Sequence, residues 1–280
     1  MLKRTLFFLA LILNVSSLFA TPSDGKTVLL AILARNKAHV LPKFFECIDA
    51  QEYDKSLITI YINTNNNEDE TESLLTEWKE KNKHLYRNII FETHNVDTLP
   101  NTDPHKWTAE RFSVLGRIRN KSLQMAKEHN TDYYFVVDCD NFIAPFTLKT
   151  LIEKDKPIIA PMLKPVPEPG DPYRNYFTSI CENGYWKNDS AYWKILNHTK
   201  VGTFNVPVVH CTYLIKSEYI DRLTYVDGTQ HYEFVIFSKS ARDAGIGQYI
   251  CNEKEFGTLI HMCKKATLEQ EKEVVTKLYG

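Results

Sequence analysis

The first half of the chain alternates between apolar runs and amphipathic segments. The run at 26–34 is almost wholly apolar, which is typical of a central parallel strand buried on both faces. The predicted strands are 26–34, 56–62, 89–91 and 133–137, and the predicted helices are 40–49, a segment from 71 onwards that Thr71 caps, and 110–128. Strands that alternate with helices in this way predict a mostly parallel sheet.

The alternation stops after residue 140, and the second half of the chain is richer in loops. We expect helices at 145–154, 234–241 and 267–279, strands at 157–162, 206–215 and 248–251, and a proline-rich aromatic loop at 165–176. His210 falls within the strand at 206–215, where a lone histidine is more often structural than a ligand. The whole pattern indicates the α/β class.

Two aspartates, Asp138 and Asp140, stand where the strand at 133–137 ends. Ligands of open α/β sheets bind outside the carboxyl ends of the strands, and Mg²⁺ or Mn²⁺ takes carboxylate oxygens together with substrate phosphates. Other acidic pairs, such as Glu253 and Glu255, lie in polar surroundings that read as a solvated face. From the residues alone, Asp138 and Asp140 fit a metal site or a strand-end turn.

Two further polar groups are open to two interpretations. Arg35 and Asn36 end the first strand and form either a turn or a contact to a nucleotide. Arg117 and Arg119 lie on the helix at 110–128, where cations usually face solvent, although either can face a diphosphate.

The composition is that of a globular protein of one large or two small domains, with 280 residues, 43% of them hydrophobic and 25% charged. A net charge of −1 argues against a broad nucleic-acid surface. Residues 1–20 combine Lys3 and Arg4 with a short apolar run and small residues, which predicts a signal peptide cut after Ala20. An uncleaved anchor is the alternative, and no other window predicts a stable membrane span.

Export makes disulfides and glycans possible. The chain has six cysteines and no CxxC pair, so a zinc cage is not expected. We expect one or two disulfides among the four later cysteines, which are Cys181, Cys211, Cys251 and Cys263. The sequons at Asn188 and Asn197 lie in loop-like sequence, whereas Asn120 lies in a predicted helix. The cluster of Tyr185, Trp186, Tyr192 and Trp193 is either core or a surface on which sugars stack.

An ordered set of blocks gives these features a family context. LLAILARN, INTNNNEDETESLLTEW, AERFSVLGRIRN, YYFVVDCDNFI, IIAPML, GYW, VPVVHCTYLI and YICNEKEFG follow one another in the chain. From 26 to 257 the sequence resembles the N-terminal glycosyltransferase domain of the procollagen galactosyltransferase and cerebral endothelial cell adhesion molecule family. The resemblance implies a GT-A type αβα sandwich in residues 21–280, with a nucleotide-binding half at 26–141 and a loop-rich acceptor half at 142–280.

The same resemblance implies a site. The donor is a UDP-sugar, the cofactor is Mn²⁺ or Mg²⁺, and the acceptor is a hydroxyl, as on hydroxylysine of a collagen-like chain. Asp138 and Asp140 hold the metal, His210 completes its ligands, and Glu233 is the general base if the enzyme inverts. The residues implied to line the nucleotide and its diphosphate are Ala34, Arg35, Asn36, Asn65 and Arg119.

The chain departs from the family pattern at several points. Tyr232 and Asn65 stand where relatives show aspartate, and the chain ends at Gly280 without the family's second transferase-like domain or a KDEL-type signal. These departures leave two rivals beside the transferase: a catalytically silent adhesion or binding module, and a metal-dependent hydrolase of sugar nucleotides. A eukaryotic signal peptide implies the endoplasmic reticulum lumen or secretion, and a bacterial one implies the periplasm.

Overall fold

A computed structural model describes residues 25–96, 108–167, 175–262 and 266–280. The predicted signal peptide at 1–20 lies outside these residues. Within the described part of the chain, no helix combines the length and the apolar character that a membrane crossing requires.

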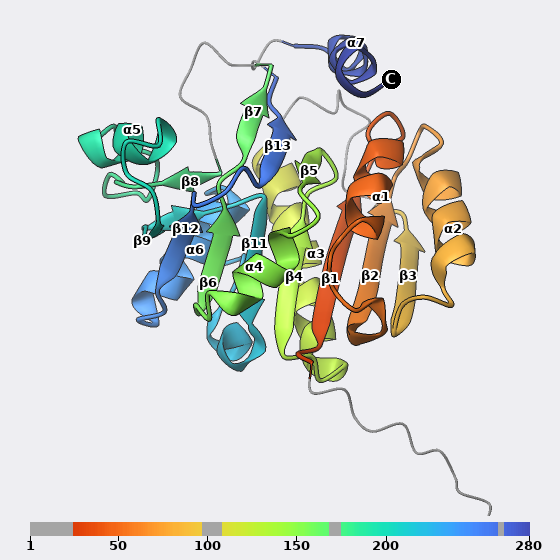
Figure 1. Ribbon diagram of the computed structural model, residues 1–280, viewed down its shortest axis with the longest axis horizontal. Helices are drawn as coiled ribbons and strands as arrows, with labels where there is room; N and C mark the ends of the chain where they lie inside the picture. The colour runs from red at the N-terminus through yellow and green to blue at the C-terminus, as the bar shows by residue number, and fades with distance from the viewer. Residues whose placement is uncertain (1–24, 97–107, 168–174, 263–265) are drawn as a thin grey trace, which may run out of the picture.

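One sheet of eight strands, in the order β3-β2-β1-β4-β11-β6-β12-β9, runs through the whole molecule (Figure 1). Its strands are β1 (Val28–Ala34), β2 (Ile58–Asn65), β3 (Asn88–His94), β4 (Tyr133–Val137), β6 (Ile158–Pro161), β9 (Thr203–Asn205), β11 (Thr212–Lys216) and β12 (Gln248–Cys251). Strands β3, β2, β1 and β4 are mutually parallel, whereas β11 is antiparallel to both β4 and β6. The first half of the chain, where strands and helices were expected to alternate, therefore forms the parallel part of the sheet, as predicted.

Two small sheets lie beside the large one. Strands β8 (Tyr176–Phe177) and β10 (Val208–Val209) pair with each other, and β13 (Gly257–Ile260) pairs with β5 (Asn141–Ile143) and β7 (Lys164–Val166). All five strands have at most four residues, which is too short for a periodic signal in the sequence.

Helices cover both faces of the large sheet (Figure 1). They are α1 (Leu41–Asp49), α2 (Thr71–Asn82), α3 (Ala109–Glu128), α4 (Thr147–Glu153), α5 (Ser190–Leu196), α6 (Glu233–Asp243) and α7 (Leu268–Tyr279), with two 3-10 turns, η1 (Lys55–Leu57) and η2 (Ser217–Arg222). Alternate residues of β1 belong to two cores: Leu30 packs with α1, α2 and α4, and Leu29 packs with α3 and α6. Burial on both faces explains why β1 is a continuous apolar run. The helices on both faces of the sheet confirm the predicted αβα sandwich.

The predicted strand at 206–215 is wrong in one respect, because the chain breaks between β10 and β11. Cys211 adopts a positive φ of 65°, which lies outside the β region of backbone conformation. The break lets the Cys211 carbonyl accept the backbone N–H of Asp138 at 3.1 Å. His210 therefore lies at a turn beside the end of β4 and not within a strand.

Two other expectations need correction. Glu70, not Thr71, occupies the cap position of α2, and the Thr71 hydroxyl instead accepts the backbone N–H of Lys37 at 2.7 Å. Cys181 and Cys251 carry free thiols, so the expected disulfides do not form at these two positions. Cys263, the last of the four candidates, lies outside the described residues.

Candidate active site

A cavity of about 680 Å³ opens at the carboxyl ends of β1, β2 and β4. Its walls come from the two halves of the chain, including the start of α6 and the first turns of α7. All nine residues that the resemblance implies for the site line this one cavity: Ala34, Arg35, Asn36, Asn65, Arg119, Asp138, Asp140, His210 and Glu233. Arg117, the alternative to Arg119, is exposed and does not line it. The structure thus brings together side chains that lie up to 199 positions apart (from 34 to 233).

Sheet register explains why the strand ends converge. Ala34, the last residue of β1, pairs with Thr64 of β2, and Asn65 follows directly. On the other side of β1, Ala31 pairs with Val136, so the same register places Asp138, the residue after β4, opposite Leu33 and one residue short of Ala34. Parallel neighbours end at the same edge, and the polar residues after them must therefore meet there.

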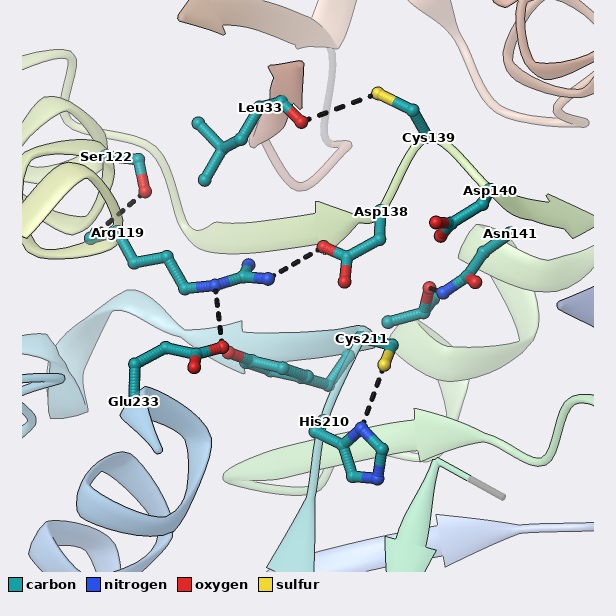
Figure 2. Close-up of polar contacts among 12 residues, drawn as sticks. Leu33, Arg119, Ser122, Asp138, Cys139, Asp140, Asn141, His210, Cys211 and Glu233 are labelled. Carbon is teal, nitrogen blue, oxygen red and sulfur yellow. Dashed lines mark hydrogen bonds and ion pairs between the residues drawn. The ribbon is translucent and has the colours of Figure 1, made fainter. Parts of the chain in front are cut away.

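Asp138 and Asp140 line the cavity, and each carboxylate is held by a cation. Figure 2 shows the pair of Arg119 and Asp138. Arg119 Nη2 lies 2.8 Å from Asp138 Oδ1, and Lys37 Nζ lies 2.8 Å from Asp140 Oδ2. The two carboxylate side chains are 27% and 28% exposed. They are therefore accessible from the cavity, yet already neutralised by the protein's own side chains.

His210 does not join the two aspartates in a three-ligand cluster. Its Nδ1 lies 2.8 Å from Cys211 Sγ, and this thiol separates the imidazole from the aspartates in the view of Figure 2. Among the residues that the structure describes, no group of three or more His, Cys, Asp and Glu side chains is arranged to hold a metal ion. A divalent ion at Asp138 and Asp140 would need further oxygen ligands from a bound substrate or water.

Arg119 links Asp138 to Glu233. It reaches from α3 between the two carboxylates, with its Nε 3.6 Å from Glu233 Oε1 (Figure 2). Arg119 is only 4% exposed, so it acts first as the buried counter-charge of these two acids. Its Nη1 has no hydrogen-bond partner among the described residues, which leaves the N–H groups of this nitrogen available to a ligand.

Glu233 is the first residue of α6 and is 5% exposed. Its Oε2 makes no hydrogen bond to any described residue. Burial raises the pKa of Glu233 from its ordinary 4.5 to about 7, against the opposing charge of Arg119. A buried carboxylate with one unpartnered oxygen and a pKa near neutrality is suited to accept a proton.

The pKa of Glu233 predicts how stability depends on pH. Because the folded pKa is raised, protonated Glu233 favours the fold; this contribution is complete below about pH 4.5 and is lost as the pH rises through about 7. We expect Glu233→Gln to raise the free energy of unfolding by about 3 kcal/mol at pH 8.5 and to leave it unchanged at pH 4.5. Urea unfolding at the two pH values measures this difference, with the exposed Glu255→Gln as control. A gain that is equal at both pH values would show that the Glu233 charge is not its cause.

Asn36 and Asn65 have different surroundings. The side chain of Asn36 is occupied, because its Oδ1 accepts the Glu68 N–H at 2.8 Å, while its own N–H binds Asn67. It fixes the loop after β1 against the loop after β2. Asn65 is 6% exposed, and its Oδ1 has no partner within the described chain, so it is the better candidate for a contact to a ligand.

The aromatic cluster divides between core and cavity. Tyr192 is buried in the second core and Trp193 is on the surface, whereas Tyr185 and Trp186 line the cavity. Tyr232, which precedes Glu233, stacks on Phe112 of α3 with ring centroids 4.1 Å apart. Aromatic rings therefore form the wall next to Glu233.

Sequence reasoning missed three charged residues of the cavity, Lys37, Arg111 and Glu271. Only the place of Lys37 in the sequence, directly after Asn36, could have indicated that it lines the cavity. Glu271 belongs to α7, which the sequence presents as an ordinary charged helix. Nothing local indicates that this helix contributes a wall to a cavity built by β1 and β4.

Comparison with known proteins assigns the family. The sequence model for "Glycosyltransferase family 25, N-terminal domain" matches residues 25–279. The chain belongs to glycosyltransferase family 25. Family 25 membership agrees with the resemblance seen in the ordered sequence blocks.

Curated relatives in the family include both active and inactive proteins by name. The chain is 34% identical over 262 residues to procollagen galactosyltransferase 2 of Homo sapiens, covering 90% of this chain and 41% of the relative. It is 30% identical over 257 residues to inactive glycosyltransferase 25 family member 3 of Mus musculus, covering 88% of this chain and 43% of the relative. The chain thus spans about two fifths of the length of these relatives.

Solved structures support the GT-A fold of this family 25 chain. The structure of GalNAc-T7 with UDP, GalNAc and Mn²⁺ superposes with a TM-score of 0.55 at 16% identity. The superposition covers 85% of this chain and 44% of the other. At this identity the likeness concerns the fold alone.

Proposed function

We propose that this chain is a glycosyltransferase that moves a hexose from a UDP-sugar to a hydroxyl acceptor. The observation that carries the proposal is the convergence on one cavity of about 680 Å³ of the nine residues that the resemblance implies. Membership of family 25 and the GT-A fold support it. The names of the relatives favour a collagen-like chain as the acceptor, and the family resemblance implies hydroxylysine as the residue that accepts the sugar.

The donor would lie across the ends of β1, β2 and β4. Asn65, with its unpartnered Oδ1, and Arg35, whose Nε is buried without a described partner, offer polar contacts to the nucleotide. Ala34 and Asn36 complete this wall, and the free Nη1 of Arg119 is available to the diphosphate. We propose that residues 26–141 supply the donor half of the site and residues 142–280 the acceptor half.

Asp138 and Asp140 are the residues that would hold Mn²⁺ or Mg²⁺. Two carboxylates that face one cavity, with no third ligand among the described residues, suit an ion whose remaining ligands are substrate phosphates and water. When bound, such an ion neutralises charge on the leaving diphosphate. His210 is 3% exposed and stacks on Phe234, so a role in shaping the cavity suits it as well as ligation.

Glu233 would act on the acceptor. In an inverting reaction its carboxylate takes the proton of the attacking hydroxyl, and its raised pKa favours that transfer near neutral pH. Arg119 holds the Oε1 side of the same carboxylate, so Oε2 is the oxygen available to the hydroxyl. In a retaining reaction the donor's own phosphate would take this role, and Glu233 would not be needed as a base.

The rival function is a silent binding module. It is favoured by the likeness to inactive glycosyltransferase 25 family member 3, and by the loss of an acidic side chain at Tyr232. The accessible Asp138 and Asp140 pair favours the enzyme instead.

Turnover separates these functions. We expect the natural protein, with Mn²⁺, to transfer sugar from one of a panel of UDP-hexoses to a collagen-like peptide that contains hydroxylysine. Release of UDP together with a peptide mass gain of one hexose is the measurement. UDP release that no acceptor diverts would indicate the hydrolase, and absence of any UDP release with every donor and acceptor would indicate the silent module.

The secretory pathway is the proposed location. The predicted signal peptide at 1–20 and the exposed sequons Asn188 and Asn197 support it. Asn120 is bonded through its side chain to Thr224 and Tyr225, so a glycan there would break these contacts.

A further inference from the structure

Lys37 is the cation that holds Asp140, and nothing in the proposed function assigns it a role. Its ammonium lies 2.8 Å from Asp140 Oδ2 and 3.4 Å from Glu271 Oε1. The side chain is 25% exposed and lines the cavity, so it is accessible to a ligand. Lys37 therefore has a long, flexible side chain, and its ammonium group lies in the candidate donor site.

Both ends of Lys37 are anchored. Its backbone N–H donates to Thr71 Oγ1 at 2.7 Å, which fixes the Cα beside the start of α2. Its ammonium is held by Glu271 of α7, whose carboxylate also lies 2.7 Å from His39 Nε2. Glu271 is 4% exposed, so the second anchor is buried. A solvated surface lysine has neither constraint.

Helix α7 is itself fixed where it contributes Glu271. A capping box between Thr267 and Gln270 starts the helix, and Tyr279 at its other end bonds Thr258 of β13 through the two hydroxyls at 2.8 Å. The C-terminal helix therefore places Glu271, and through it the ammonium of Lys37, in the cavity.

The cavity carries no excess negative charge before any ligand binds. Among the described lining residues, four acids face four permanent cations: Asp138, Asp140, Glu233 and Glu271 against Arg35, Lys37, Arg111 and Arg119. A divalent ion alone would give this cavity excess positive charge. Bound at Asp140, the ion would also lie next to the Lys37 ammonium, which already pairs with that carboxylate. A diphosphate that arrives with the ion restores the balance and offers the ammonium new oxygen acceptors.

We propose that Lys37 competes with the divalent ion for Asp140 in the empty site and turns to the donor's diphosphate when the ion takes Asp140. This inference rests on the proposed function, since it assumes a nucleoside diphosphate as the ligand. Its consequence is that ion and nucleotide bind together, with the ion bound weakly when no nucleotide is present. Glu271 is the positioning residue that keeps Lys37 within reach of both partners.

The test measures Mn²⁺ binding without nucleotide, from the free-ion signal in electron paramagnetic resonance. Removing the competing charge in Lys37→Met is expected to tighten Mn²⁺ binding at least about tenfold. At saturating Mn²⁺, the same variant is expected to bind UDP at least about tenfold more weakly, because the ammonium no longer reaches the diphosphate. Lys37→Arg keeps the charge and should retain the natural affinities more closely than Lys37→Met does.

Lys43→Met is the matched control, because Lys43 lies on α1, pairs with Glu46 and does not line the cavity. It should leave both affinities unchanged. If Lys37→Met does not fold, Lys37→Gln serves in its place, since it removes the charge but keeps a polar chain. Mn²⁺ affinity that is unchanged or weaker in the uncharged variant overturns the proposal, whatever happens to UDP. Failure of every variant and of the natural protein to bind UDP would instead overturn the proposed function, which the nucleotide-free titration does not use.

Discussion

Asp140→Ala is expected to weaken Mn²⁺-dependent binding of UDP by more than about 100-fold. The carboxylate of Asp140 is accessible and lines the cavity. A Mg²⁺-type ion is held by only one or two carboxylates, so removal of one of them strongly weakens binding of the ion. Calorimetric titration of UDP into the variant and the natural protein, both at saturating Mn²⁺, gives the ratio of the two dissociation constants.

The fold should survive this change, because Lys37 retains Glu271 as a partner when Asp140 is removed. Thermal unfolding therefore checks that a loss of binding is local. Glu255→Ala is the matched control, since Glu255 belongs to another acidic-x-acidic pair, is exposed and does not line the cavity. Natural UDP affinity in Asp140→Ala would remove this residue from the proposed donor site.

Glu233→Gln is expected to slow sugar transfer by about 10²–10⁴-fold while UDP affinity stays within about twofold of natural. The amide keeps the shape of the side chain but cannot take a proton from the acceptor. Because glutamine keeps an Oε1 beside Arg119, and position 233 belongs to α6 and not to the strand ends that would hold the nucleotide, donor binding should be spared. Rates of transfer at saturating donor and acceptor measure the effect.

Asp243→Asn at the other end of α6 is the control for Glu233, since Asp243 is an exposed partner of Lys239. It removes a carboxylate from the same helix without touching the cavity. A Glu233→Gln variant that transfers sugar at the natural rate would rule out Glu233 as the base and favour a retaining reaction.

The donor side of the site could be predicted because it depends on local pattern and on topology. Polar residues directly after apolar strands, such as Arg35 and Asp138, meet wherever those strands are parallel neighbours. The sequence shows both the strands and their polar ends. Asp140 follows from the same rule, whereas Ala34 and Asn65 came from the family resemblance; all three line one cavity.

Contacts between distant segments could not be predicted in this way. Glu271 reaches Lys37 across 234 positions, and only the packing of α7 decides that contact. The break at Cys211 was hidden because its neighbours on both sides are apolar and β-forming, so the run reads as one strand. Thr71 looked like a helix cap, but its hydroxyl is used to hold Lys37 instead.

For Glu233 the sequence predicted the type of side chain but not its chemical environment. The family resemblance placed a carboxylate at this position, whereas its chemistry depends on burial at the start of α6 and on Arg119. Neither the raised pKa nor the unpartnered Oε2 has a signal in the sequence around 233.

The central claim is that this cavity binds a nucleoside diphosphate with the help of a divalent ion. Calorimetric titration of UDP into the natural protein, once with Mn²⁺ and once with EDTA, tests it most directly. The account predicts saturable one-to-one binding with Mn²⁺ that weakens at least about tenfold with EDTA. Absence of UDP binding in the presence of Mn²⁺ would contradict it.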